Sequence, residues 1–322
     1  MKSITILGSG AWGTAIATVL AHNGHRVTIW SHEAQSADEI NQRHTNSTFL
    51  PEVLLHESIS ATTSLPEACR NSEWIFEAVP VQFLRSVFVA AACHIRQDHK
   101  FVLLSKGIEQ ETALLPSQIL LETCGSRTSH IVVSGPSFAK DLAQKQLTGV
   151  IAATAQISLL NDLKNILEND YFKIIPSTDV VGVQLCAALK NVITFGIGVL
   201  DGAGYTDNTK SLFFVKILEE TKTLMSSCKG QPETLLGLAG IGDLVLTAFG
   251  KHSRNLAAGQ RVGKGESISS IQASLEAVPE AFNSVISVKQ LIATQQLSLS
   301  LFEGLYSIMQ GAVSVPEFIK NL

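Results

Sequence analysis

Three glycines near the start of the chain stand between two segments of opposite character. Gly8, Gly10 and Gly13 follow a short apolar segment, Ile4–Leu7, and precede a proline-free apolar segment, Ala11–Ala21. The first segment predicts a buried strand and the second predicts a helix. In such a unit the glycines permit a tight turn, close approach of a pyrophosphate to the backbone, and close packing of helix on strand. Because a helix N-terminus also attracts phosphates, the pattern predicts a dinucleotide site.

Loops after three other predicted strands carry further polar residues. They are Glu77-Ala78-Val79-Pro80, Ser105-Lys106-Gly107 and Ser134-Gly135-Pro136-Ser137-Phe138. Ligands of a doubly wound sheet bind beyond the carboxyl ends of its strands, so we expect these loops to line the ligand site. Lys106 is the cation among them. A lysine at a strand end is more often solvated, and ligand binding by Lys106 is the alternative.

The C-terminal half contains a lysine in an apolar setting. Lys190 and Asn191 interrupt the otherwise apolar segment 185–193. A helix that is apolar on all faces is buried, so its lysine must reach the surface, pair with a carboxylate, or do chemistry. Burial lowers the pKa of a lysine, which suits proton transfer near neutrality. A structural ion pair and a proton-transfer role both remain open.

Two later segments could complete such a site. Asp243 is the carboxylate of a glycine-rich apolar segment, 237–247, where it either caps a helix starting at Leu244 or meets Lys190. The segment 251–255 groups cations with hydrogen-bonding side chains, and the guanidinium of Arg254 suits a phosphate. A solvated helix start is the simpler interpretation of that segment.

Composition narrows the class of protein. The chain has 322 residues, 45% hydrophobic and 16% charged, which fits about two domains of roughly 150 residues each. A net charge of −4 without a basic block argues against nucleic acid as a partner. The five scattered cysteines form no C-x-x-C pair, and the nine histidines show no metal-ligand spacing. We therefore expect reduced thiols in the cytoplasm and no metal site.

Apolar segments of the chain are short. No uncharged apolar run reaches the roughly 18–20 residues that a membrane span requires, so we expect no stable membrane insertion. The start of the chain, a lysine followed by apolar residues, superficially resembles a signal peptide. The fingerprint glycines and the following strand, Arg26–Trp30, favour a folded domain instead.

The alternation of segments predicts the fold. Expected strands are Ile4–Leu7, Arg26–Trp30, Trp74–Val79, Phe101–Ser105, His130–Ser134 and Thr148–Ala153. Expected helices between and after them are 12–22, 33–43, 65–70, 82–95, 113–123, 136–144 and 157–168. This alternation predicts a parallel sheet covered on both faces.

From about Asp179 the strand signals fade and helical segments follow one another. They are 179–200, 208–228, 231–237, 252–263, 267–274, 278–293 and 300–310. We expect an α/β protein with an N-terminal Rossmann-like doubly wound sheet, residues 1–178, and an all-α C-terminal domain, residues 179–322. The first domain is expected to bind the dinucleotide and the second to bind the substrate.

Several segments, taken together, resemble the bacterial-type soluble NAD(P)-dependent glycerol-3-phosphate dehydrogenases. The matching segments are 8–15, 105–109, 134–139, 188–192, 201–202, 208–209, 237–247 and 253–255. The glycine fingerprint alone is shared by many proteins. The ordered set, spread over nearly the whole chain, is specific to this family.

The resemblance implies a reaction and a set of residue roles. The reaction is reversible reduction of dihydroxyacetone phosphate to sn-glycerol 3-phosphate, which supplies phospholipid synthesis, in a cytoplasmic homodimer. Lys190 is implied as the acid/base at the substrate C2 oxygen, with Lys106 and Asp243 completing the catalytic set. Implied substrate-binding residues are Lys106, Gly135, Ser137, Asn191, Asp243, Ser253, Arg254 and Asn255. Implied cofactor-binding residues are Gly8, Gly10, Ala11, Trp12, Gly13, His32, Lys106, Ala139, Arg254, Val278 and Glu280.

The choice between NAD and NADP stays open. An acidic side chain after the second strand favours a free ribose 2′-OH, and a cation there favours a 2′-phosphate. Here the strand is followed by Ser31-His32-Glu33, whereas the family usually has a basic residue where His32 stands. The family's usual Val-Glu-Gly is also altered, to Val278-Pro279-Glu280-Ala281.

Two other functions remain as alternatives. A related enzyme with the same fold would act on a 2-hydroxy or 3-hydroxy carboxylate, because the Arg254 guanidinium binds a carboxylate equally well. A non-catalytic NAD(P)-binding regulator is disfavoured because Lys106, Lys190 and Asp243 are all present.

Overall fold

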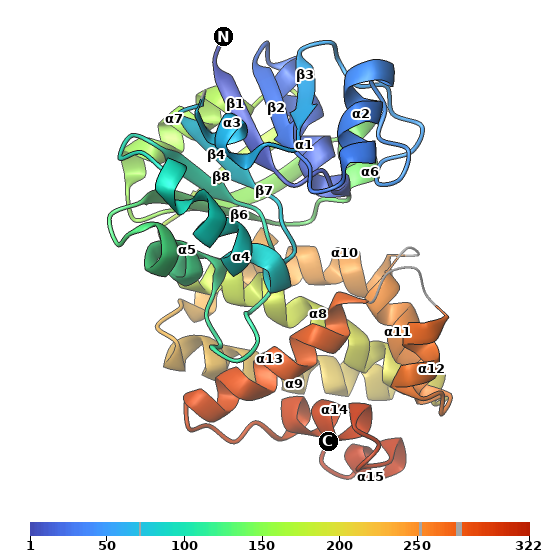
Figure 1. Ribbon diagram of the computed structural model, residues 1–322. Coiled ribbons are helices and arrows are strands. Elements are labelled where there is room, and N and C mark those ends of the chain that lie inside the picture. The colour runs from blue at the N-terminus through green and yellow to red at the C-terminus, as the bar shows by residue number, and fades with distance from the viewer. Residues whose placement is uncertain (71, 251–252, 275–278) are drawn as a thin grey trace. The chain divides into compact units, whose positions relative to one another are not determined.

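The computed structural model describes residues 1–70, 72–250, 253–274 and 279–322 (Figure 1). The chain forms two compact units. Unit 1 contains Met1–Lys106 and Pro116–Val180, and unit 2 contains Gly107–Leu115 and Val181–Leu322. The assignment of cofactor binding to residues 1–178 and substrate binding to residues 179–322 stays a prediction.

Unit 1 is built on one eight-stranded sheet with the order β3-β2-β1-β4-β5-β6-β7-β8. The strands are β1 (Ser3–Leu7), β2 (Arg26–Trp30), β3 (Ile59–Thr62), β4 (Trp74–Glu77), β5 (Lys100–Leu103), β6 (Ser129–Ser134), β7 (Thr148–Ala153) and β8 (Phe172–Ser177). This arrangement confirms the Rossmann-like α/β fold. The expectation of a wholly parallel sheet is wrong at one pair, because β7 runs antiparallel to β6. The connection between them holds only a five-residue helix, α6, whereas parallel crossovers are usually built on a longer helix.

Two strands of the sheet were not predicted. β3 is four residues long, and β8 is half exposed and ends in Pro176 and Ser177. Both lie at the edges of the sheet, where burial is incomplete and the apolar pattern is weak. The apolar pattern that identifies a strand is strongest where both faces are buried. The two edge strands, β3 and β8, therefore could not be predicted from it.

Helices of unit 1 connect the strands (Figure 1). They are α1 (Ala11–His22), α2 (Ala34–Arg43), α3 (Leu65–Arg70), α4 (Val81–Ala91), the 3₁₀ turn Ala92–His94, α5 (Pro116–Cys124), α6 (Ala139–Ala143) and α7 (Ile157–Leu167). The predicted helix 113–123 begins later, at Pro116, because Ala113 adopts a positive φ of 58°. The predicted helix 136–144 is shorter, because its first residues form a turn after β6.

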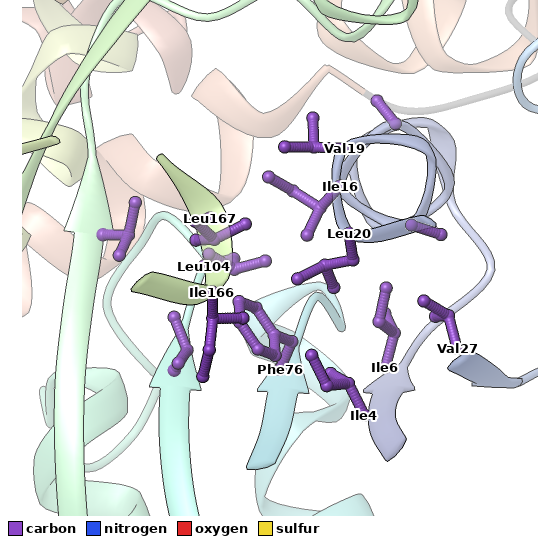
Figure 2. Packing of buried hydrophobic residues seen from close by; sticks show 14 of the residues in the cluster. Ile4, Ile6, Ile16, Val19, Leu20, Val27, Phe76, Leu104, Ile166 and Leu167 are labelled. Carbon is purple, nitrogen blue, oxygen red and sulfur yellow. The ribbon is translucent and has the colours of Figure 1, made fainter. Parts of the chain in front are cut away.

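The core of unit 1 holds α1 against the sheet. Figure 2 shows Ile16 and Leu20 of α1 beside Ile6 of β1 and Phe76 of β4, and all four side chains are fully buried. Burial of each such side chain contributes about 1.5–3 kcal/mol relative to exposure. This packing fixes the register of the central strands, so their carboxyl ends lie along one edge of the sheet.

Among the described residues of unit 2, the regular elements are all helices. Its helices are α8 (Val180–Gly202), α9 (Asp207–Ser227), α10 (Asp243–Phe249), α11 (Arg254–Gly263), α12 (Ile268–Ala273), α13 (Glu280–Thr294), α14 (Ser300–Met309) and α15 (Val315–Ile319), with a 3₁₀ turn at Pro232–Leu236 and a π turn at Leu238–Gly242. The predicted helix 231–237 is therefore a 3₁₀ turn, and α15 was not predicted. His252 and Val278, where two predicted helices start, lie outside the described residues.

One described helix, α8, is long and apolar enough to pass a length-and-composition test for a membrane span. Within its most apolar window, 83% is buried in the structure. Lys190 also interrupts its apolar run. Both features are typical of the core helix of a folded domain.

Candidate active site

The glycine fingerprint forms the turn between β1 and α1. Gly8 has a φ of 113°, and a Cβ there would lie 2.6 Å from the carbonyl oxygen of Ala78. A Cβ at Gly13 would overlap the carbonyl oxygen of Gly8. A Cβ at Gly10, by contrast, would meet nothing within 4 Å. Gly8 and Gly13 thus allow close packing within unit 1, whereas Gly10 leaves open space at the N-terminus of α1.

That space fits the pyrophosphate of a dinucleotide. Gly10 is the N-cap residue of α1. Because glycine has no side chain, no side chain at this position caps the helix. The first N–H groups of a helix have no partner within the helix, and the helix dipole favours an anion there. Ala11 and Trp12 form the first turn and are partly exposed. These features support their predicted cofactor role.

Hydrogen bonds beneath the glycine turn hold it in place. The hydroxyls of Ser9 and Ser31 lie 2.8 Å apart, which links the turn to the end of β2. Asn46 is 1% exposed and donates to the Ser9 carbonyl oxygen at 2.7 Å and to Thr14 Oγ1 at 2.8 Å. His32 is exposed one residue beyond Ser31. Asn46 was not predicted, because it lies in a loop without a sequence pattern.

The loops after β5 and β6 meet at the same edge of the sheet. Lys106 Nζ donates to the carbonyl oxygen of Gly135 at 3.3 Å, and Ser137 Oγ donates to the same oxygen at 2.9 Å. Ala139 follows as the first residue of α6 and packs partly against the core. The structure therefore brings Lys106, Gly135 and Ser137 together, as expected from their positions after neighbouring strands.

A buried carboxylate lies at the end of β4. Glu77 is 0% exposed, and burial raises its pKa to about 7, although several hydrogen-bond donors oppose that rise. Val79 N donates to Glu77 Oε1 at 2.7 Å, and Ser105 Oγ donates to Oε2 at 2.9 Å. The sequence indicates Glu77 only as one residue of a strand-end cluster.

In unit 2, Lys190 and Asp243 form a buried ion pair. Lys190 Nζ lies 2.6 Å from Asp243 Oδ1 and 3.0 Å from Thr247 Oγ1. Thr247 Oγ1 donates in turn to the Asp243 carbonyl oxygen at 2.7 Å. Of the two interpretations of Asp243, helix capping is wrong, since Asp243 is the first residue of α10 and Gly242 holds the N-cap position. Thr247, one turn later on α10, was not predicted as a site residue.

Amide side chains form a second network beside this pair. Asn191 Nδ2 donates to Glu280 Oε2 at 3.1 Å, and Asn255 Nδ2 donates to Asn191 Oδ1 at 2.9 Å. Asn255 Oδ1 accepts from the backbone N–H of Ala281 at 3.1 Å. The structure thereby joins Asn191, Asn255 and Glu280, which lie far apart in the sequence.

The start of α11 presents the remaining predicted substrate residues. Ser253 is its N-cap, and the Ser253 hydroxyl accepts from the backbone N–H of Leu256 at 3.2 Å. Arg254, the next residue, is exposed. A guanidinium at a helix N-terminus is suited to a phosphate group. Val278, a predicted cofactor residue, lies outside the described residues.

Close packing of α8 and α11 sets the position of these residues. A Cβ at Gly198 would overlap the carbonyl oxygen of Leu256, and one at Gly259 would overlap that of Phe195. Gly202 and Gly263 make equivalent contacts one turn further along. Only glycines allow the two backbones this approach, which places Asn255 within hydrogen-bonding distance of Asn191.

Comparison with protein families gives two matches. Residues 3–160 match the NAD-dependent glycerol-3-phosphate dehydrogenase N-terminus, and residues 179–320 match the NAD-dependent glycerol-3-phosphate dehydrogenase C-terminus. The matched ranges leave little of the chain outside them.

Individual proteins show the same similarity. Glycerol-3-phosphate dehydrogenase (NAD(P)+) of Lactiplantibacillus plantarum is 35% identical, with 100% of this chain and 97% of that protein covered. The protein of the same name from Bacillus subtilis is 34% identical, with 100% and 94% covered.

Solved structures agree with these relatives. Glycerol-3-phosphate dehydrogenase of Coxiella burnetii has a TM-score of 0.93 at 28% identity, covering 99% of this chain and 98% of that one. A ketopantoate reductase from Ralstonia eutropha has a TM-score of 0.65 at 11% identity, covering 96% and 98%, which indicates a shared fold alone.

Proposed function

Because this chain belongs to the NAD-dependent glycerol-3-phosphate dehydrogenase family, we propose that it reduces dihydroxyacetone phosphate to sn-glycerol 3-phosphate and catalyses the reverse reaction. The observation that carries the proposal is the buried contact of Lys190 with Asp243 and Thr247. An ammonium group held in this way is positioned to give a proton to a bound carbonyl oxygen.

NADH or NADPH, when bound, supplies the hydride that reaches C2 of the substrate. Lys190 donates a proton to the C2 oxygen as negative charge develops there, so a C–H bond and an O–H bond replace the carbonyl π bond. Lys190 is left neutral and regains its proton from solvent. Asp243 favours the protonated ammonium through its negative charge and fixes its direction. In the reverse reaction the neutral amine acts as the base.

Other residues bind the two ends of the substrate. Arg254 contacts the phosphate, assisted by the N-terminus of α11 and by Ser253. Asn191 and Asn255 orient the hydroxyl groups through their amides. Lys106 supplies a second cation at the reacting end.

The cellular role follows from the product. The chain supplies the glycerol phosphate backbone for phospholipid synthesis and works in the cytoplasm. The five cysteines are free thiols, which supports a reducing compartment. The chain acts as a homodimer, and the exposed Leu212 and Val215 of α9 support such an apolar contact. Light scattering that reports only the monomer mass of 34.6 kDa would contradict the homodimer.

Turnover assays with the purified protein test the activity. Dihydroxyacetone phosphate is compared with 2-oxo acids as substrate, each with NADH and with NADPH. We expect oxidation of the cofactor with the triose phosphate and little with the acids. Turnover of an acid without turnover of the triose phosphate would favour the hydroxy-carboxylate alternative.

A further inference from the structure

Glu77 is a buried carboxylate that the proposed reaction does not use. It ends β4, where it pairs in register with Leu7 of β1 and Leu103 of β5. Its side chain is fully buried, and burial of a carboxylate is costly unless donors surround it. The donors to its side chain include the backbone N–H of Val79, the Ser105 hydroxyl and, at 3.4 Å, the backbone N–H of Ser105.

These donors belong to two different loops, one after β4 and one after β5. Val79 lies in the turn after β4, and the preceding residue, Ala78, packs directly against Gly8 and Gly13 of the fingerprint. Ser105 directly precedes Lys106 in the loop after β5. One carboxylate therefore joins the turn that supports the glycines to the loop that carries Lys106.

The ionised and protonated forms of Glu77 make different hydrogen bonds to these two loops. The carboxylate accepts from both backbone N–H groups and from the hydroxyl. The protonated form has one O–H donor, which must turn toward Ser105 Oγ and gives up an acceptor position. Because its pKa is raised to about 7, both forms are populated near neutral pH.

Charged and titratable side chains on the neighbouring elements have other hydrogen-bond partners. Arg85 of α4 bonds Glu122, and Lys100, at the far end of β5, bonds Glu73. Lys106 donates to the Gly135 carbonyl oxygen, and His22, at the far end of α1, lies 3.4 Å from Lys145 Nζ. The groups that donate to the Glu77 side chain, the backbone N–H groups of Val79 and Ser105 and the Ser105 hydroxyl, are uncharged.

We propose that Glu77 is a positioning residue: its carboxylate holds the turn after β4 to the loop after β5, and protonation of Glu77 weakens both cofactor binding and the placement of Lys106. The kinetic part of this inference rests on the proposed function. The binding part does not, since it requires only the nucleotide.

Glu77→Gln gives the direct test, because glutamine has nearly the same shape and stays neutral at every pH. Dissociation constants of NADH and NADPH, and kcat/KM for dihydroxyacetone phosphate, are measured from about pH 6 to about pH 8.5. We expect the wild type and the variant to agree at the acid end. At the alkaline end the variant binds the preferred nucleotide about tenfold more weakly, with a similar loss in kcat/KM. A ratio of variant to wild type that does not change with pH overturns the proposal.

Glu73→Gln is the matched control, since Glu73 directly precedes the same strand at its opposite end and pairs with Lys100. Its binding and kinetic constants should follow the wild type at every pH. A pH-dependent loss in this variant equal to that of Glu77→Gln would also overturn the proposal.

Ser105→Ala keeps the test decisive if Glu77→Gln does not fold. It removes a hydroxyl that donates to the carboxylate, so the pH transition of nucleotide binding moves upward, by about half a unit or more. An unmoved transition rejects the inference. Failure of the wild type to reduce dihydroxyacetone phosphate rejects the proposed function instead, and the nucleotide titrations still decide the role of Glu77.

Discussion

Lys190 and Asp243 lie 53 positions apart in the sequence, yet Lys190 Nζ and Asp243 Oδ1 are 2.6 Å apart. The side chains are only 10% and 1% exposed. Removing two charges from water costs several kcal/mol per ion, and an apolar pair of equal volume is often as stable or more so. Stability alone therefore does not account for this pair, which fits the proton-transfer role that we propose for Lys190.

Lys190→Met should lower turnover strongly. Because it leaves the buried Asp243 carboxylate without its counter-ion, folding of the variant is verified before its turnover is compared. Methionine fills the same space without a proton to donate, and loss of a general acid typically costs 10²- to 10⁴-fold in rate. We expect kcat to fall by about that factor and the nucleotide dissociation constant to stay within about twofold. Unchanged turnover in this variant would remove Lys190 from the mechanism.

Asp243→Ala should destabilise the protein strongly. It leaves the Lys190 ammonium buried without its counter-ion, which typically costs about 3–5 kcal/mol. Thr247→Val is the matched comparison, because it removes an uncharged acceptor of the same ammonium, worth about 1.5–3 kcal/mol. Denaturant unfolding measures both. Equal losses of unfolding free energy in the two variants would show that the ion pair stabilises the fold no more than the hydrogen bond does.

Sequence patterns predicted the parts of the site that carry a local signature. The glycine fingerprint lies between β1 and α1 because its three glycines, the buried strand and the apolar helix are contiguous. Lys106 and Gly135 also lie together as expected, since both lie in loops that follow neighbouring strands of the sheet. Such elements can be predicted directly from the spacing of apolar residues along a short segment of sequence.

Partners that depend on packing between distant helices were harder to predict. Thr247 lies on a short apolar helix, where a threonine is ordinary, and only the distance to Lys190 reveals its role. Asn46 lies in a loop, where no periodicity exists to single it out. Glu77 gave no signal of its own because a single acidic residue in a strand is normally expected at the surface.

Gly259→Ala should loosen the contact between α8 and α11. The added Cβ would overlap the carbonyl oxygen of Phe195, so the two backbones must separate. Overpacking of this kind costs about 1–3 kcal/mol, and it moves Asn255 away from Asn191. We expect a lower unfolding midpoint together with a raised KM for dihydroxyacetone phosphate. Ala257→Ser, on the exposed face of α11, is the control and should change neither value.

Glu77 should make stability depend on pH in a defined direction. The folded-state pKa of about 7 lies above the ordinary value of 4.5 in the unfolded chain. Between these values the folded protein binds more protons, so the free energy of unfolding falls as the pH rises, by about 3 kcal/mol over the whole window.

Glu77→Gln removes this titration. The difference in unfolding free energy, variant minus wild type, should therefore increase from about pH 4.5 to about pH 7 and then level off. Urea unfolding at a series of pH values measures it. A constant difference would mean that Glu77 has the same pKa in both states.

Gly10 and Gly13 should respond in opposite ways to the same substitution. A Cβ at Gly10 meets nothing within 4 Å, whereas a Cβ at Gly13 overlaps the carbonyl oxygen of Gly8. Gly10→Ala should therefore leave the unfolding midpoint almost unchanged and weaken NADH and NADPH binding about tenfold or more, because the methyl group occupies the space of the pyrophosphate. Gly13→Ala should lower the midpoint by an amount equivalent to about 1–3 kcal/mol, because α1 must move away from β1. Thermal unfolding and nucleotide titration of both variants separate the two effects. Tight nucleotide binding by a folded Gly10→Ala protein would show that the cofactor does not approach the backbone at this turn.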